Sequence, residues 1–246
     1  MAEISKPKVE SSTALVTGGT AGIGRATALA LARDGFFVWV HGRNAERGNA
    51  TVQAIEAAGG RAKFVAADLN DIDAVECLAE AVGEVDVLVN NGGFSWFGPT
   101  TDLEPAEFDA LFAANVRSAY YLVAALAPKM AKNCGGSIVN LGSMAGQVGL
   151  AGSAAYSATK AALAALTRSW AAEFSPSHVR VNAIAPGPVF TDGASPERIT
   201  ALGEATLLSR AANAEEIAEV IAFLISDKAS YITGAVIAAD GGRTAI

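Results

Sequence analysis

The stretch Ala14-Leu15-Val16-Thr17-Gly18-Gly19-Thr20-Ala21-Gly22-Ile23-Gly24 decides the fold of this 246-residue chain. A short apolar run ends in a glycine-rich turn, and a helical pattern follows. Glycines here allow a tight turn, close approach of the backbone to a pyrophosphate, and close packing of helix on strand. The first helical turn would offer free N–H groups and a partial positive charge to phosphates. The Gly-x-x-x-Gly-x-Gly spacing therefore predicts a phosphate-binding loop, with a plain glycine-rich turn as the alternative.

Short β-branched runs alternate with longer helical patterns along the rest of the chain. The predicted strands are Ala14–Val16, Phe36–Val40, Lys63–Ala66, Val85–Val89, Ser137–Leu141, Arg180–Ile184 and Ala235–Ala238. The predicted helices are Gly24–Arg33, Glu46–Ala58, Ala74–Ala81, Glu107–Ala127, Ala155–Phe174 and Glu215–Ile225. This alternation implies a parallel sheet with right-handed crossovers and helices on both faces. We predict an α/β fold, a single doubly wound Rossmann-type domain of about seven parallel strands.

Composition and charge narrow the domain organisation and the partners. No Pro/Ser-rich linker divides the chain, so residues 13–246 are predicted as one domain and residues 1–12 as a flexible N-terminal segment. The net charge of -7 disfavours nucleic acid and anionic membranes as partners. The first twelve residues lack the apolar core of a signal peptide, and we expect no apolar run long enough to span a membrane. A cytoplasmic protein is the default expectation.

Cysteine and histidine usage predicts neither a disulfide framework nor a metal site. The two cysteines, Cys77 and Cys134, are not in CxxC spacing. The two histidines, His41 and His178, form no cluster with the cysteines at the spacing that zinc requires.

Tyr156 and Lys160 stand four residues apart in a predicted helix, and therefore share one helix face. A free tyrosine titrates near pH ~10 and is a poor acid-base group at neutral pH. A fixed cation beside it favours the phenolate and lowers that pKa. The pair predicts a tuned general acid/base, although a lone pair of this spacing is also common on a solvated helix face.

In doubly wound sheets, ligands bind beyond the carboxyl ends of the strands. Arg43 follows the second strand, where an Asp or Glu would bind the ribose hydroxyls of NAD. A guanidinium can form bidentate bonds to a phosphate, so Arg43 favours NADP(H), with NAD(H) as the alternative. The alternative is that Arg43 is a solvent-exposed arginine at the start of a helix and binds no phosphate. Asp68, which follows the third strand, could accept a hydrogen bond from adenine or simply cap a turn or helix.

These residues together resemble the short-chain dehydrogenase/reductase family, from about Ala14 to Gly242. The resemblance is carried in order by the glycine loop, Asn90-Asn91-Gly92-Gly93, Asn115, Ser143, Tyr156 with Lys160, Val181-Asn182-Ala183-Ile184-Ala185-Pro186-Gly187, Ile232-Thr233-Gly234 and Asp240-Gly241-Gly242. It includes the 3-oxoacyl-carrier-protein reductases. Carrier protein is acidic, so this substrate would need a local basic patch, for which Lys129, Lys132 and Arg168 are candidates.

The resemblance implies a role for each matching residue. Tyr156 would deliver or remove the substrate proton, and Lys160 would lower its pKa and hold the nicotinamide ribose. Ser143 would hydrogen-bond the substrate oxygen, and Asn115 would anchor a water in a proton relay. The implied cofactor-binding residues are Gly18, Thr20, Gly22, Ile23, Gly24, Arg43, Asp68, Leu69, Asn91, Gly93, Tyr156, Lys160, Pro186, Gly187, Val189 and Thr191. The implied substrate-binding residues are Ser143, Ala145, Phe94, Trp96 and Leu150.

Two residues depart from the family pattern. Gly92 stands where members usually have alanine, so the cofactor floor is expected to shift slightly. Ala21 stands in the glycine loop where many NADP-preferring members carry a basic residue, so phosphate recognition would rest mostly on Arg43.

The sequence gives less information about the residues that would contact the substrate. Phe94, Trp96 and Phe97 would form an apolar wall or simply pack their loop onto the body, and these two alternatives remain open. Residues 189–208 are polar and rich in small residues, and resemble a short, mobile substrate lid.

The resemblance implies an oxidoreductase that transfers a hydride between NADP(H) and a ketone or secondary alcohol, with a small-molecule substrate and a homotetrameric assembly. The alternatives are NAD(H)-dependent alcohol oxidation and a non-catalytic nucleotide sensor or scaffold on the same fold.

Overall fold

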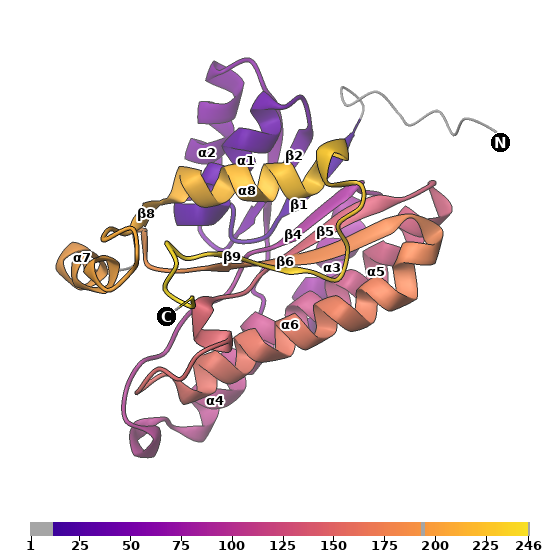
Figure 1. Cartoon of the computed structure of the whole chain (residues 1–246). Helices are drawn as coiled ribbons and strands as arrows, with labels where there is room; N and C mark the ends of the chain where they lie inside the picture. Colours follow the sequence, from indigo (N-terminus) through magenta and orange to yellow (C-terminus); the bar gives the residue numbers. More distant parts are fainter. Residues whose placement is uncertain (1–11, 193–194, 246) are drawn as a thin grey trace.

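A seven-stranded, fully parallel sheet forms the centre of the protein, in the order β3-β2-β1-β4-β5-β6-β9 (Figure 1). The computed structural model describes residues 12–192 and 195–245. The strands are β1 (Thr13–Val16), β2 (Phe37–Gly42), β3 (Arg61–Ala66), β4 (Val87–Asn90), β5 (Gly136–Leu141), β6 (Val179–Pro186) and β9 (Val236–Ala239). All seven predicted strands are present, and the predicted α/β class with a doubly wound parallel sheet is confirmed.

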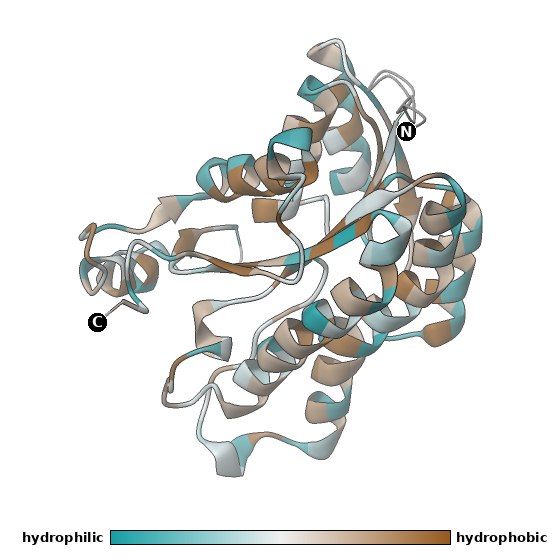
Figure 2. Ribbon diagram, turned by 45° about the vertical axis from the view of Figure 1, so that its right-hand side comes forward, coloured by the Kyte–Doolittle hydropathy of each residue, from teal (hydrophilic) through white to brown (hydrophobic). Residues whose placement is uncertain are grey.

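The central strands are apolar because helices cover both of their faces. Every residue of β4 is buried, as are all but one of the residues of β1 and of β6. Parallel strands covered on both faces are near-continuous hydrophobic runs rather than alternating ones. Figure 2 shows this apolar band running through the sheet between the helical layers.

Helices cover the two faces in separate groups. One face carries α1 (Gly22–Arg33), α2 (Ala45–Ala57) and α8 (Ala214–Ile225), whose apolar residues share one core cluster. The other carries α3 (Ile72–Val82), α5 (Ser118–Lys132) and α6 (Ala154–Phe174), which share the second cluster. The helix α4 (Pro105–Phe112) continues through a π-helical turn at Ala113–Arg117 into α5 (Figure 1).

The joined helix Pro105–Lys132 spans 28 residues. It is long and apolar enough, by length and composition, to cross a membrane. However, 56% of its most apolar window is buried inside the protein. Its residues Leu122, Val123 and Leu126 belong to the core cluster beneath the sheet. Packing on the sheet therefore accounts for the apolar character of this helix.

The segment predicted as a lid contains structure that the sequence did not predict. It holds a helix, α7 (Pro196–Glu204), and a short strand, β7 (Val189–Phe190), which pairs in parallel with β8 (Ala212–Asn213) just beyond the segment. The α7 helix begins with Ser195, whose Oγ accepts from Arg198 N at 3.3 Å. Residues 193 and 194 of this segment lie outside the described residues, as do residues 1–11 of the predicted N-terminal segment.

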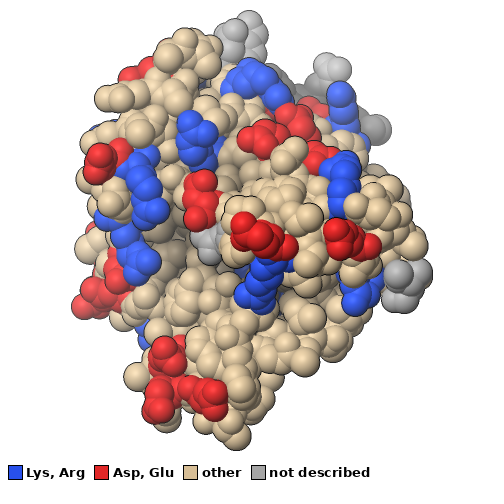
Figure 3. Space-filling model, turned by 90° about the vertical axis from the view of Figure 1, so that its left-hand side faces the viewer, with Lys and Arg blue, Asp and Glu red and all other residues tan. Residues whose placement is uncertain are grey.

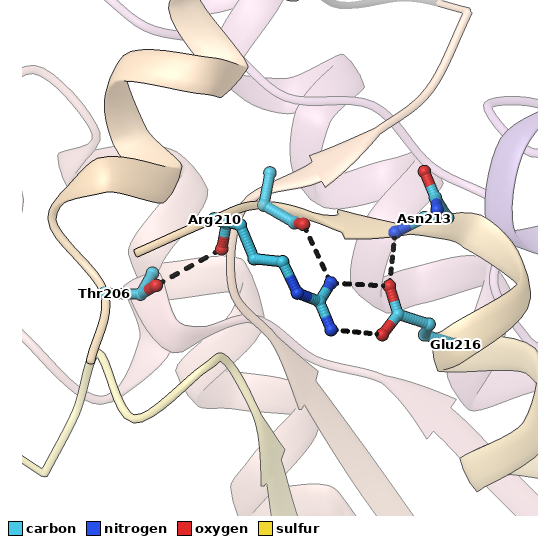
Figure 4. A network of polar contacts seen from close by, with 5 residues as sticks. Thr206, Arg210, Asn213 and Glu216 are labelled. Carbon is cyan, nitrogen blue, oxygen red and sulfur yellow. Dashed lines mark hydrogen bonds and ion pairs between the residues drawn. The ribbon is translucent and has the colours of Figure 1, made fainter. Parts of the chain in front are cut away.

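A polar network fastens the far end of this segment to α8 (Figure 4). The Arg210 guanidinium donates to both Glu216 oxygens, at 2.8 and 2.7 Å. Glu216 Oε2 also accepts from Asn213 N, which closes a capping box at the start of α8. Thr206 Oγ1 donates to Arg210 O at 3.2 Å. The network therefore fixes residues 206–216 as one unit, while α7 extends away from the sheet (Figure 1).

Candidate active site

The glycine loop between β1 and α1 has the backbone that its sequence requires. Gly18 and Gly22 have φ of +64° and +48°, in the left-handed region that favours glycine. A Cβ on Gly24 would collide with the Gly18 carbonyl and the Asn91 side chain, so α1 can approach the loop only through a glycine. The Asn91 amide donates to Thr17 O at 2.8 Å and to Gly18 O at 3.2 Å, which ties β4 to the loop.

A cavity of about 360 Å³ opens beside this loop, at the carboxyl ends of the strands. Ten of the predicted cofactor residues line it: Gly18, Thr20, Gly22, Ile23, Arg43, Asp68, Leu69, Asn91, Gly93 and Thr191. Six do not: Gly24, Tyr156, Lys160, Pro186, Gly187 and Val189. Figure 3 looks onto this face and shows Lys and Arg side chains gathered along one side of it, with acidic side chains among them.

His41 supports the glycine loop through hydrogen bonds, a role that the sequence analysis did not predict. It is the next-to-last residue of β2 and is 2% exposed. Its Nδ1 accepts from Gly18 N at 3.2 Å, and its backbone oxygen accepts from Gly19 N at 2.8 Å. Its Nε2 lies 3.2 Å from Ala67 O, so the neutral tautomer with the proton on Nε2 satisfies both ring nitrogens. Burial is the main cause that lowers the pKa of His41 to about 4.

Two arginines line the cavity, although the sequence analysis identified only one of them. Arg43 follows β2, and Arg47 lies in the first turns of α2; both are exposed. Asn44 between them caps α2 by accepting from Arg47 N at 2.9 Å.

Asp68 lines the same cavity, and its carboxylate closes a turn. Its Oδ1 accepts from both N and Nδ2 of Asn70, at 3.0 and 3.1 Å. The N-cap of α3 is Asp71, which excludes the helix-cap alternative for Asp68. The turn interpretation is therefore correct, and the adenine interpretation stays a prediction because Asp68 remains at the cavity wall.

Ser143, Tyr156 and Lys160 converge beside the cavity, from the end of β5 and the first turns of α6. The Ser143 hydroxyl hydrogen-bonds to Tyr156, and Lys160 Nζ lies 5.6 Å from the centre of the Tyr156 ring. Lys160 is 7% exposed, and its Nζ donates to Leu141 O at 2.7 Å. The structure therefore brings these three side chains together.

Burial affects the pKa values of Tyr156 and Lys160 more than the electrostatic interaction between the two side chains does. Burial raises the pKa of Tyr156, and the Ser143 hydrogen bond opposes this only in part. Burial lowers the pKa of Lys160 to about 8. The sequence predicted instead that the nearby cation lowers the tyrosine pKa, which is not the direction in this structure. At neutral pH, Tyr156 is accordingly protonated and Lys160 charged.

Asn115 lies in the π-helical turn Ala113–Arg117 and is 2% exposed. Its Oδ1 accepts from Phe94 N at 3.0 Å, and its Nδ2 donates to Phe94 O at 2.9 Å. Its Nδ2 also donates to Thr159 Oγ1 at 3.1 Å. Single π-helical turns are frequent at functional sites. Asn115 thus joins the loop after β4 to α6, next to Tyr156 and Lys160.

The three aromatic residues after β4 divide between the two predicted alternatives. Phe94 lines the cavity, and the Phe97 ring lies 5.6 Å from that of Tyr156. Trp96 packs against Gly98, whose N–H donates to Gly152 O at 2.9 Å. Phe94 and Phe97 therefore lie at the site, whereas Trp96 packs within its own loop, which the Gly98 backbone ties to the segment before α6.

The remaining predicted substrate residues differ in their exposure. Ala145 is 3% exposed and gives its N–H to Ser143 Oγ at 3.1 Å, so it positions the serine. Leu150 is partly exposed in the segment before α6.

The residues proposed as a basic docking patch do not surround the site. Lys129 and Lys132 lie in the last turns of α5, just before β5 begins. That position is the amino end of the parallel sheet, opposite the cavity. Lys129 Nζ donates instead to Gly83 O, the C-cap of α3.

Close packing explains why residue 92 is a glycine rather than an alanine. A Cβ at this position would lie 2.5 Å from Leu69 Cδ1, so the Leu69 side chain fills the space that an alanine methyl would need.

Within residues 12–192 and 195–245, no group of three or more His, Cys, Asp or Glu side chains could hold a metal ion.

The comparison with protein families gives one match that covers most of the chain. The model described as "Enoyl-(Acyl carrier protein) reductase" matches residues 18–244. It spans the glycine loop, the Tyr156 region and the segment that follows β6.

Similar proteins of known name align with this chain over nearly their whole length. The cyclopentanol dehydrogenase of Comamonas sp. is 36% identical, over 97% of this chain and 99% of the relative. The 3-oxoacyl-[acyl-carrier-protein] reductase of Thermotoga maritima is 34% identical, over 96% of this chain and 98% of the relative. A blue fluorescent protein from a metagenomic library, solved in complex with NADPH, is 34% identical with a TM-score of 0.88 over 94% of this chain and 97% of that one.

Proposed function

This chain belongs to the short-chain dehydrogenase/reductase family, and from that premise we propose that it is an NADP(H)-dependent oxidoreductase that interconverts a ketone and a secondary alcohol. The observation that carries the proposal is the meeting of Ser143, Tyr156 and Lys160 beside the cavity at the glycine loop. The two named relatives are a dehydrogenase of an alcohol and a reductase of a ketone, which supports the reaction class.

The cavity fits a dinucleotide. Gly18 and Gly22 bring the backbone to its wall without side chains, and the N-terminus of α1 opens toward it. We propose that Arg43 and Arg47 hold the 2′-phosphate of the adenosine ribose, since both residues line the cavity and a guanidinium can donate bidentate hydrogen bonds to a phosphate. Bound NADP(H) supplies or accepts the hydride; the protein supplies position and electrostatic field.

The proposed chemistry of reduction follows from the protonation of Tyr156 and Lys160. As a ketone gains the hydride, negative charge develops on its oxygen. The Ser143 and Tyr156 hydroxyls would donate to that oxygen, and Tyr156 would transfer its proton to it. The raised pKa of Tyr156 keeps that proton on the phenol until charge develops. The Lys160 ammonium would then stabilise the phenolate that is left, and its pKa of about 8 keeps it charged at neutral pH.

A non-catalytic nucleotide sensor is the rival function. Such a protein would need the glycine loop and not the proton-transfer groups. Here Lys160 is charged although it is only 7% exposed, and burying a charged group is energetically unfavourable. A protein that only bound a nucleotide would not need this buried charge. This burial supports an enzyme over a sensor.

The replacement Tyr156→Phe tests the proposal. It removes only the hydroxyl that would carry the proton, so turnover is expected to fall by at least a thousandfold while NADPH affinity stays nearly unchanged. NADPH oxidation over a panel of ketones and calorimetric titration with NADPH measure the two quantities. The matched control is Tyr231→Phe, which removes the hydroxyl of a fully exposed tyrosine. Unchanged turnover in Tyr156→Phe would exclude this mechanism.

A further inference from the structure

Arg198 extends from α7 over the entrance to the site. Its guanidinium carbon lies 4.4 Å from the centre of the Phe97 ring, and that ring lies 5.6 Å from the ring of Tyr156. One aromatic ring therefore separates the guanidinium from the proposed proton donor. A cation over the face of a phenyl ring is attracted by the ring quadrupole, which orients the guanidinium beside the site.

Within residues 12–192 and 195–245, no acidic side chain forms an ion pair with Arg198. The arginines that do form such pairs there include Arg33, with Asp34 and Glu219, and Arg210, with Glu216. The adjacent carboxylate, Glu197, accepts instead from Ser195 Oγ at 2.6 Å, and this hydrogen bond is the main cause that lowers its pKa. No described residue accepts a hydrogen bond from the Arg198 guanidinium, so its N–H groups are available for an acceptor beside Phe97.

The surface between Arg198 and Tyr156 is apolar. Phe97 is 40% exposed and Phe94 is 42% exposed, while the backbone hydrogen bond from Gly98 N to Gly152 O ties their loop to the segment before α6. An aromatic or aliphatic body placed against Phe97 would have one end at Tyr156 and the other at Arg198.

We propose that the substrate of this enzyme is a ketone or secondary alcohol bearing a carboxylate, which Arg198 binds across an apolar body. The inference rests on the proposed function, because it takes the reacting carbonyl to lie at Tyr156. A carboxylate is planar and accepts two parallel N–H bonds, which matches the guanidinium edge. Arg198 is then a specificity-determining residue: it selects the far end of the substrate and leaves the chemistry to the groups around Tyr156.

A matched pair of ketones tests this inference. In 4-acetylbenzoate, one phenyl ring separates the carbonyl from a carboxylate; its methyl ester has the same ring and ketone but no charge. Reduction of either moves a hydride from NADPH to the carbonyl carbon and a proton to its oxygen. With the wild-type enzyme, kcat/KM for the acid is expected to exceed that for the ester by tenfold or more.

The replacement Arg198→Met keeps the length and apolar stem of the side chain and removes the charge. It is expected to abolish the preference, through a rise in KM for the acid with a much smaller change for the ester. If Arg198 only holds α7 closed over Phe97, the acid and the ester lose turnover together. The matched control is Lys63→Met, which removes a cation 5.3 Å from the centre of the Trp39 ring, away from the site; it should keep the preference.

The outcomes separate the two proposals. Equal kcat/KM for acid and ester in the wild-type enzyme, or an undiminished preference in Arg198→Met, overturns the inference while leaving the proposed function intact. If no ketone in a broad panel oxidises NADPH, the proposed function fails and the inference fails with it.

Discussion

At the scale of single residues, burial changes the chemistry that sequence spacing implies. Tyr156 and Lys160 share a helix face, and spacing alone suggests that the cation makes the phenol acidic. The structure removes both groups from water, which raises the pKa of Tyr156 and lowers that of Lys160. Spacing gives the distance between two groups, whereas the solvent around them depends on the loops that cover them. Those loops, Phe94–Gly98 and the segment before α6, carry no periodic signal in the sequence.

The two arginines that line the cavity allow a residue-scale prediction. Replacing Arg43 or Arg47 with serine is expected to weaken NADPH binding about tenfold to a hundredfold each, because a hydrogen bond to a charged group contributes about 1.5–3 kcal/mol. NADH binding should change little, since NADH lacks the 2′-phosphate. Calorimetric titration with both cofactors measures the effect. Arg168→Ser, an exposed arginine on α6, is the control. If the NADPH/NADH affinity ratio stays constant in both variants, neither arginine binds the phosphate.

One physical reason explains why the sequence analysis did not identify three residues to which the structure gives a role. His41, Arg47 and Arg198 act through groups that are distant in sequence: His41 through Gly18, Arg47 through the cavity, and Arg198 through Phe97. By contrast, the glycine loop and the Tyr156/Lys160 pair are encoded within a few consecutive residues. Local patterns were therefore predictable, and partners brought together by the fold were not.

At the scale of elements, long strands and helices were predictable and the segment after β6 was not. The buried strands carry runs of β-branched residues, and α6 has a helical pattern over 21 residues. The strands β7 and β8 have two residues each, which is too short for a periodic signal. The helix α7 has one buried residue, Gly203, so its apolar pattern is almost absent. Its position depends on the network of Arg210 and Glu216 at its far end.

That network yields a prediction about local motion. Glu216→Gln removes the charge that pairs with Arg210, and is expected to speed hydrogen exchange in residues 195–213 severalfold. The melting temperature should change little, because both side chains are about half exposed. Hydrogen-exchange mass spectrometry measures the first quantity and calorimetry the second. Glu219→Gln, which breaks the exposed pair between α8 and α1, is the control and should leave the exchange of this segment unchanged. Equal acceleration in both variants would show that the segment is not anchored by Glu216.

At the scale of the whole molecule, the parallel sheet and its two helical layers follow from the alternation of strands and helices, so the sequence predicted them, whereas the order of the strands came from the structure. Residues brought together from the two ends of the chain were less predictable. Arg33 of α1 pairs with Glu219 of α8 across 186 positions, with the shortest N–O distance at 2.6 Å. Nothing local in either helix specifies its partner.

The acid stability of the whole molecule is expected to depend on His41. Its pKa falls from 6.5 in the unfolded chain to about 4 in the fold, so between these values the unfolded chain binds the extra proton. Its contribution, about 3 kcal/mol from the size of this shift, is fully present above pH 6.5 and is lost as pH falls toward 4. Chemical denaturation at pH 7 and pH 5 measures the loss.

The control for this prediction is His41→Gln, which keeps one donor and one acceptor but does not titrate in this range. Its free energy of unfolding should vary less between pH 7 and pH 5 than that of the wild type. Glu216 behaves in the same direction at lower pH: its pKa is lowered to about 2, so its contribution is lost only as pH falls below about 4.3. An equal slope in both proteins between pH 7 and pH 5 would exclude His41 as the cause.

The π-helical turn at Ala113–Arg117 also constrains how this gene can change in length. A π turn holds one residue more than an α turn, so the long helix contains an insertion that its hydrogen bonds have absorbed. Deleting one codon there would restore a regular helix and rotate everything on one side of the deletion by about 100° relative to the other. Either Asn115 would turn away from Phe94 and Thr159, or Leu122 and Leu126 would leave the core. In this stretch, single substitutions are therefore easier to accommodate than the loss of one codon.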